Sequence, residues 1–277
     1  MITTQYDVAC KSAIDELRLI DARLSVLDIF LSQSKQKIES NTLIGNELFN
    51  SGFAFRDITI SKELDNLFMP TDFYSLNRIN LTDEIELILS RESLFQVAQA
   101  YEILETYLYN QIADYIRLNE ELILPKDLRI TSRRFSDVRL ALKRMQGRTN
   151  NRHLLGILRE NNLIFQYHEV NNVYDLNFND WIEMISEVRH SITHNRTQLN
   201  TYLQNELPET FDRYFKVKQL NGETYIHTSV QDCKELLHTL GGYIFFIYKA
   251  VTDGTFGTQT SFSVGHFMHD PCCNEST

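Results

Sequence analysis

The sequence predicts a mainly α-helical protein. The chain has 277 residues but only four prolines and ten glycines, the two residues that most often interrupt helices. The long stretches between them are rich in Leu, Ile, Glu, Lys, Arg and Gln, and their apolar residues recur at helical spacing. Because 43% of the residues are hydrophobic, the chain can bury a substantial core in one large or two modest domains.

The first helix is expected from Thr4 to Ser40. Its apolar residues recur every three or four positions and form one stripe along the helix, as expected for a helix that packs on a core. The stripe consists of Ile14, Leu17, Ile20, Leu24, Leu27 and Leu31. From residue 41 to residue 81 glycines and Pro70 break the pattern, so we expect a connector with one or two short elements.

A second long helix is expected to begin near Thr82, within the capping signal Thr82-Asp83-Glu84, and to end before Pro125. Two shorter helices, at 132–145 and 150–161, are expected on either side of Gly147. Another helix is expected at 180–195, with Asp180 as its cap.

The pattern then changes to that of a β-hairpin. Two short strands are expected between residues 211 and 228, joined around Asn221-Gly222, and a last helix is expected at 229–251. The sequence therefore divides into an N-terminal helix with its connector (1–81), a helical bundle (82–251) and an irregular tail (252–277).

The sequence also indicates the cellular compartment of the protein. The N-terminus lacks the basic and apolar regions of a secretory signal, and no apolar stretch has the length of a membrane span. The four cysteines lack the spacing of a disulfide framework, which favours a reducing compartment. We therefore expect a cytoplasmic protein that makes no membrane contact.

The charge is distributed unevenly. The chain carries a net charge of −10, yet residues 126–160 contain ten Lys or Arg and only three acidic residues, a local net charge of +7. A concentrated basic segment in an acidic chain is typical of a phosphate-binding surface, although it can also be a solvated helix face. The candidate RNA-binding residues in this segment are Arg133, Arg134, Arg139, Lys143, Arg144, Arg148 and Arg152.

The most informative stretch runs from Glu187 to Arg196, EVRHSITHNR. It holds Arg189, then His190, three further residues, and His194, followed by Asn195. This pattern resembles the Arg-polar-x-x-x-His signature of HEPN domains, a class of small helical proteins that includes many metal-independent ribonucleases. The order of helices and the hairpin before the last helix, across about 83–251, are also similar to HEPN-like proteins of bacterial defence and abortive-infection systems.

The resemblance implies an endoribonuclease that needs no metal or other cofactor. Arg189 would hold the scissile phosphate, His194 would transfer protons, His190 would orient the pair and Asn195 would support it. The implied reaction cleaves single-stranded RNA by attack of the 2′-hydroxyl and leaves a 2′,3′-cyclic phosphate. The resemblance also implies a toxin–antitoxin or defence context, with an antitoxin protein as a possible partner.

Helix geometry favours a homodimer for such a site. Two residues five positions apart on an α-helix point about 140° apart and differ by about 7.5 Å in height. One helix therefore aims Arg189 and His194 in different directions. A two-fold axis can bring Arg189 of one copy to His194 of the other, as HEPN ribonucleases are thought to do.

Other functions fit the same residues. A HEPN-like domain could serve only for dimerisation or RNA binding, without catalysis. A ferritin-like metal site is a second alternative. Four residues on one helix face and a Glu-x-x-His pair on the last helix could bind metal together with carboxylates from two other helices. These residues are Glu183, Glu187, His190 and His194; Glu235 and His238; and Glu102 or Glu105 with Glu16.

The C-terminal tail contains four candidate zinc ligands within eight residues: His266, His269, Cys272 and Cys273. A tetrahedral zinc site made from so short a run is strained, and adjacent cysteines rarely bind one ion together. An irregular tail without metal is the favoured interpretation.

Overall fold

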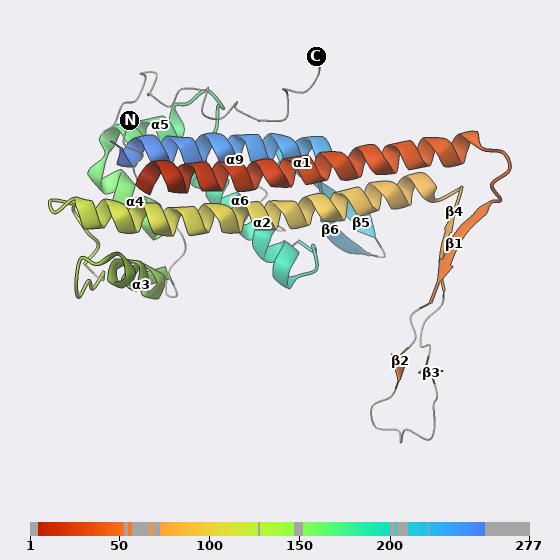
Figure 1. Cartoon of the computed structure of the whole chain (residues 1–277), viewed down its shortest axis with the longest axis horizontal. Helices are drawn as coiled ribbons and strands as arrows, with labels where there is room; N and C mark the ends of the chain where they lie inside the picture. Colours follow the sequence, from red (N-terminus) through yellow and green to blue (C-terminus); the bar gives the residue numbers. More distant parts are fainter. Residues whose placement is uncertain are drawn as a thin grey trace, which may run out of the picture.

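The computed structural model describes residues 5–52, 55–56, 67–68, 73–126, 128–146, 152–199, 203, 210–220 and 222–252. It confirms the mainly α prediction. Three long helices, α1 (Gln5–Ser40), α2 (Leu81–Leu118) and α9 (Val230–Val251), pack side by side, with α1 antiparallel to the other two (Figure 1). The 38 residues of α2 extend over about 57 Å, so this helix contacts most other parts of the fold.

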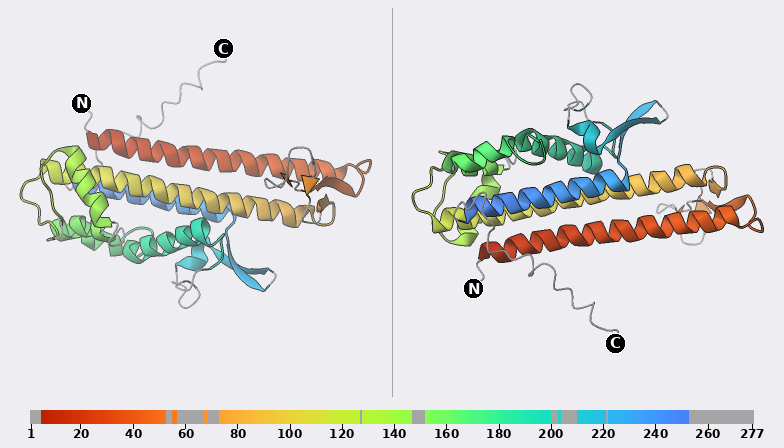
Figure 2. Two further views of the ribbon diagram at one scale, coloured as in Figure 1. Left: turned by 90° about the horizontal axis from the view of Figure 1, so that it is seen from below. Right: turned by 90° about the horizontal axis from the view of Figure 1, so that it is seen from above.

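The helices form layers around α2 and α9. Helix α1 lies on one side of this pair, and α4 (Arg152–Asn161), α5 (Leu163–Val170) and α6 (Phe178–His194) lie on the other side (Figure 2). Helix α3 (Phe135–Gln146) packs against α2, and the short α8 (Phe211–Tyr214) packs against α9. The motif helix α6 is thus on the face of the bundle opposite α1.

Short antiparallel strands complete the described fold. In the connector, β1 (Glu47–Ser51) pairs with β4 (Tyr74–Asn77), and β2 (Phe55–Arg56) pairs with β3 (Leu67–Phe68). The predicted hairpin before the last helix is confirmed as β5 (Lys216–Leu220) paired with β6 (Glu223–His227), but residues 211–214, expected in its first strand, form a short helix. Gly222 lies in its turn with a φ of 81°, a left-handed conformation that glycine adopts without steric cost.

Helix α1 contributes to the same core as α2 and α9. Leu17, Ile20 and Leu24 of the predicted stripe are fully buried, and Cys10 and Ala13 extend the stripe towards the N-terminus. The remaining predicted positions, Ile14, Leu27 and Leu31, are only half-buried. The helix predicted as an N-terminal addition therefore shares one hydrophobic core with the predicted bundle.

An aromatic cluster fixes α6 against α9. The ring of Phe178 stacks on that of Tyr243 with centroids 4.5 Å apart, and Trp181 lies edge-on to Phe178 at 5.4 Å. Trp181, Tyr243 and Tyr214 of α8 are all completely buried. Large buried aromatic side chains contribute strongly to packing, so the start of α6 is held rigidly.

Helix starts differ from the predictions in detail. The N-cap of α6 is Asn177, whose side-chain oxygen accepts a hydrogen bond from the Asn179 N–H at 3.1 Å, so Asp180 is not the cap but lies in the first turn. Helix α2 begins at Leu81, so the Thr82 capping signal is not used. Helix α9 begins as predicted, with Ser229 accepting a hydrogen bond from the Asp232 N–H at 3.1 Å.

Helices α5 and α8 are additions to the predicted set. Each is shorter than about ten residues, too short for a reliable helical period in the sequence. In the part of the chain that the structure describes, no helix combines the length and apolar character needed to cross a membrane.

Candidate functional site

The sequence of α6 separates a buried face from an exposed one. Met184, Ile185 and Val188 are completely buried between this helix and the bundle. In the last two turns, His190 and His194 are exposed and Arg189 is half-buried. The helical period therefore places the polar residues of the motif at the surface, where they can meet a ligand.

The end of α6 is fixed by the hairpin. The Thr197 N–H donates to the Ser191 carbonyl at 3.0 Å, which closes the last turn, and Asn195 is the C-cap. The Ile226 N–H then donates to the Thr197 carbonyl at 2.9 Å, and the Leu199 N–H donates to the Thr224 carbonyl at 3.1 Å. These bonds attach the chain after the motif to β6 and hold the motif in one position.

Two residues at this helix end adopt a strained backbone. Arg196 and Thr197 have φ values of 51° and 68°, in the left-handed region that disfavours β-branched residues above all. The bonds to Ser191 and β6 maintain this conformation. Strain of this kind often occurs at functional sites, which agrees with the location of the motif.

Arg189 has an ionic partner within the chain. Its Nη2 lies 3.6 Å from the Glu102 Oε1 of α2, and the two side chains are 30% and 58% exposed. The Arg189 Nε is buried and has no hydrogen-bond partner among the described residues. The guanidinium group therefore keeps an unused donor beside a weak, partly solvated ion pair.

The two histidines of the motif form a pair. The ring centroids of His190 and His194 are 4.8 Å apart at an interplanar angle of 43°. Since α6 is helical from Phe178 to His194, Arg189 and His194 point about 140° apart. Arg189 faces Glu102 of α2 whereas the histidines face outward, so one chain does not aim both groups at one phosphate.

The basic segment divides into structural and exposed residues. Arg133 donates from its guanidinium to the carbonyls of Ile116 and Asn119 at 2.9 and 3.0 Å, so it caps the end of α2. The Arg139 Nε donates to the Asn110 Oδ1 at 2.9 Å. The side chains free to face solvent on and near α3 are Arg134, Lys143 and Arg144. Arg148 and the side chain of Arg152 lie outside the described residues.

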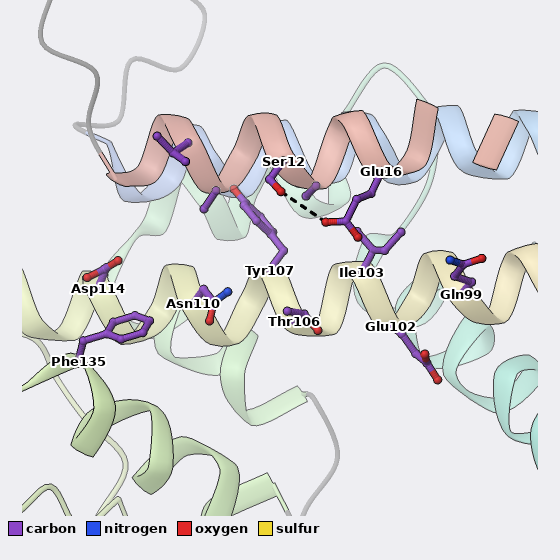
Figure 3. Close-up of a pocket in the computed structure, with 13 residues that line it drawn as sticks. Ser12, Glu16, Gln99, Glu102, Ile103, Thr106, Tyr107, Asn110, Asp114 and Phe135 are labelled. Carbon is purple, nitrogen blue, oxygen red and sulfur yellow. Dashed lines mark hydrogen bonds between the residues drawn. The ribbon is translucent and has the colours of Figure 1, made fainter. Parts of the chain in front are cut away.

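Arg139 and Arg189 contact the same side of α2. Their partners, Asn110 and Glu102, are eight residues apart and belong to one i, i+4, i+8 row on that helix. Asn110 and Glu102 are thus separated by about 12 Å along the axis of α2. In Figure 3, Glu102 points away from α1, towards the side on which Phe135 of α3 lies. The basic helix and the motif therefore share one side of the bundle.

A groove of about 590 Å³ separates α1 from α2 and reaches Phe135 (Figure 3). Its polar lining includes the carboxylates of Glu16, Glu102 and Asp114. Acidic side chains repel phosphate, so the groove itself does not suit RNA.

The described part of the chain does not bring candidate metal ligands together. Among its residues, no group of three or more His, Cys, Asp or Glu side chains is placed to hold a metal ion. Glu183, Glu187, His190 and His194 share a face of α6. The described residues do not bring together the ligand set that a ferritin-like site requires. The four candidate zinc ligands of the tail lie outside the described residues.

A buried ionic network joins α4, α5 and α9 and was not predicted. The Arg159 Nε and Nη2 donate to the two carboxylate oxygens of Glu169 at 2.5 and 2.9 Å, and the Tyr243 hydroxyl donates to Glu169 Oε1 at 2.8 Å. Burial and the nearby carboxylate raise the pKa of Tyr243 well above its ordinary value, so the hydroxyl keeps its proton. Arg159 is therefore neutralised inside the fold and does not contribute to a phosphate-binding surface.

Comparison of the chain with protein-family models, curated proteins and solved structures gives no significant match.

Proposed function

We propose that the protein is a metal-independent endoribonuclease of the HEPN type. The observation that carries this proposal is the exposed His190–His194 pair beside Arg189, on a helix end fixed by the β5–β6 hairpin. RNA cleavage without metal requires a proton acceptor, a proton donor and positive charge near the phosphate, and imidazole and guanidinium groups supply all three.

In the proposed reaction, an imidazole accepts the proton of the ribose 2′-hydroxyl, whose oxygen attacks the adjacent phosphorus. The bond to the 5′-oxygen breaks, and that oxygen receives a proton from an imidazolium group. The products are a 2′,3′-cyclic phosphate and a 5′-hydroxyl. His194 is the proton-transfer residue, Arg189 stabilises the charge on the phosphate, and His190 orients the His194 ring through their contact. Asn195 acts as the helix C-cap that keeps this geometry.

The complete site requires a second copy of the chain. Arg189 and His194 diverge on α6, but a two-fold axis beside the exposed histidines can bring Arg189 of one copy to His194 of the other. Single-stranded RNA then extends from this site towards Arg134, Lys143 and Arg144, the exposed basic side chains on and near α3. The HEPN resemblance adds the context of cytoplasmic bacterial defence, with an antitoxin as a possible further partner.

One observation favours a non-catalytic RNA-binding or dimerisation module instead. Glu102 already forms an ion pair with Arg189 at 3.6 Å, and a phosphate has to displace it. An RNA-binding module needs the basic surface but not a cleavage site shared between copies, so mixing inactive variants separates the two functions.

The mixing experiment combines Arg189→Ala and His194→Ala chains. Each variant alone is expected to be inactive. In a mixed dimer, one of the two shared sites receives an intact arginine and an intact histidine from different chains. Random assembly of the two chains is then expected to restore about one quarter of wild-type activity.

The two variants are co-expressed with different affinity tags and assayed on single-stranded RNA. His190→Ala mixed with His194→Ala is the control. In the proposed site both histidines come from the same chain, so no mixed dimer contains a site in which both are intact. Absence of recovery in the Arg189→Ala and His194→Ala mixture contradicts the shared site.

Glu102→Gln is expected to increase RNA affinity. Loss of the carboxylate removes an exposed ion pair worth about 0.2–1 kcal/mol and releases Arg189 for phosphate, so the dissociation constant should fall up to about fivefold at low salt. Fluorescence anisotropy with labelled RNA measures the change. Glu16→Gln removes the same charge from the α1 side of the groove and should have a smaller effect. Equal gains from both variants would show a general charge effect only.

A further inference from the structure

Helix α1 has a second apolar stripe that faces solvent. Leu19, Val26, Ile29 and Phe30 are 48%, 67%, 57% and 66% exposed. With Ala22 they lie on a face about 160° away from the buried stripe of Leu17, Ile20 and Leu24. Soluble proteins seldom leave such a row of large apolar side chains uncovered, which marks this face as an interaction surface.

The stripe contains a depression that fits another helix. A shallow hollow of about 460 Å³ is lined by Leu19, Ala22, Arg23, Val26, Leu27 and Phe30, and its surface is almost entirely apolar. The small side chain of Ala22 leaves space between its larger neighbours. Packing between helices commonly places a large side chain of one into such a space on the other.

We propose that this face binds α1 of a second copy in antiparallel orientation, with Val26 on the two-fold axis. In this register Phe30 of the partner subunit lies opposite Ala22 and fills the hollow, and the reciprocal contact forms on the other side of the axis. The two-fold axis makes each contact occur twice, as in any symmetric dimer.

Charge complementarity supports the antiparallel register. Asp15 and Lys37 both lie on the exposed stripe, at equal distances in sequence from Val26. Antiparallel pairing therefore places Asp15 of each copy opposite Lys37 of the other. Among the described residues, Asp15 makes a 3.8 Å contact with exposed Arg18, and its side chain is 44% exposed, so it can face a partner. A parallel arrangement places Asp15 opposite Asp15 and Lys37 opposite Lys37, which is unfavourable.

This surface is separate from the proposed cleavage site. Helix α1 and helix α6 lie on opposite sides of the α2–α9 pair (Figure 2). An α1 dimer leaves the Arg189–His194 surface of each copy exposed, so both interfaces can form in one assembly. The α1 interface can also be tested without any measurement of RNA cleavage.

Disulfide trapping tests the proposed register. Val26→Cys, in a Cys272→Ser/Cys273→Ser background, is expected to give a disulfide-linked dimer on mild oxidation, because residues at the two-fold axis of closely packed helices can reach bonding distance. Cys10 and Cys233 do not interfere, because both are buried and burial raises the pKa of each thiol to about 12. The chain used is otherwise the full wild-type sequence.

Val8→Cys is the matched control, because Val8 is 60% exposed on the same face of α1. It lies far from the axis in the antiparallel register and should not form a cross-link. A parallel pair would cross-link both variants. If Val26→Cys cross-links no faster than Val8→Cys, the proposal is overturned. The apolar stripe is then either uncovered or bound to a different protein.

A charge exchange provides an independent measurement. Asp15→Lys and Lys37→Asp each create two like-charged contacts across the axis and are expected to weaken the dimer several-fold in sedimentation velocity. The double variant Asp15→Lys/Lys37→Asp should regain wild-type association. Failure of the double variant to regain association overturns the register. Unchanged cross-linking of Val26→Cys in a His194→Ala background would show that the α1 interface is independent of the cleavage site.

Discussion

His194→Ala is expected to lower the rate of RNA cleavage by about 10²- to 10⁴-fold, the usual contribution of a group that transfers protons in the transition state. The side chain is exposed at the end of α6, so its removal opens no cavity and should leave the free energy of unfolding nearly unchanged. RNA affinity should also change little, because the positive charge of Arg189 and the basic side chains near α3 remains. The effect therefore appears in the cleavage rate and not in binding.

The matched control is His238→Ala, which removes an exposed histidine from α9. Its cleavage rate should equal that of the wild type. Arg189→Lys offers a second comparison, because lysine keeps the charge but loses the planar fork that contacts two phosphate oxygens. Full activity of His194→Ala would exclude the proposed proton-transfer role.

Arg159→Ala is expected to lower the free energy of unfolding by about 3 kcal/mol or more. The variant leaves the Glu169 carboxylate, which is 2% exposed, without the guanidinium group that donates two hydrogen bonds to it. The Tyr243 hydroxyl continues to donate to Glu169, but one neutral donor does not compensate a buried charge. Because this network joins α4, α5 and α9, its loss should loosen the layer that supports α6.

Urea denaturation followed by circular dichroism measures this change. Arg117→Ala is the comparison, since Arg117 pairs with Asp114 at 2.9 Å but its side chain is 32% exposed, and the expected loss is at most about 1 kcal/mol. Glu169→Gln combined with Arg159→Met removes both charges and should recover part of the stability. A similar loss for Arg159→Ala and Arg117→Ala would show that burial does not strengthen the network.

Much of the fold follows from local sequence patterns. The predicted boundaries of the first, motif and last helices lie within two residues of those of α1, α6 and α9, because apolar spacing is a short-range signal. The hairpin is equally local, because Asn221-Gly222 favours a tight turn between two strands. The antiparallel strands of the connector were not predicted in detail, because pairing between β1 and β4 joins residues more than twenty positions apart.

The candidate site was predicted only in part. Sequence alone placed Arg189, His190 and His194 on one helix, but the ion pair of Arg189 with Glu102 depends on the packing of α6 on α2. The same limit applies to Arg133, which appears as a basic surface residue in the sequence and caps α2 in the fold. Long-range partners decide whether a charged side chain can meet a ligand, and no local pattern encodes them.

The most direct test of the proposed function is the chemistry of the RNA ends. Purified wild-type protein is incubated with single-stranded RNA in EDTA, beside the Arg189→Ala/His194→Ala double variant. The proposal predicts fragments with 2′,3′-cyclic phosphate and 5′-hydroxyl ends from the wild type and intact RNA from the double variant. Intact RNA with both proteins, or cleavage that appears only after a divalent metal ion is added, would contradict it.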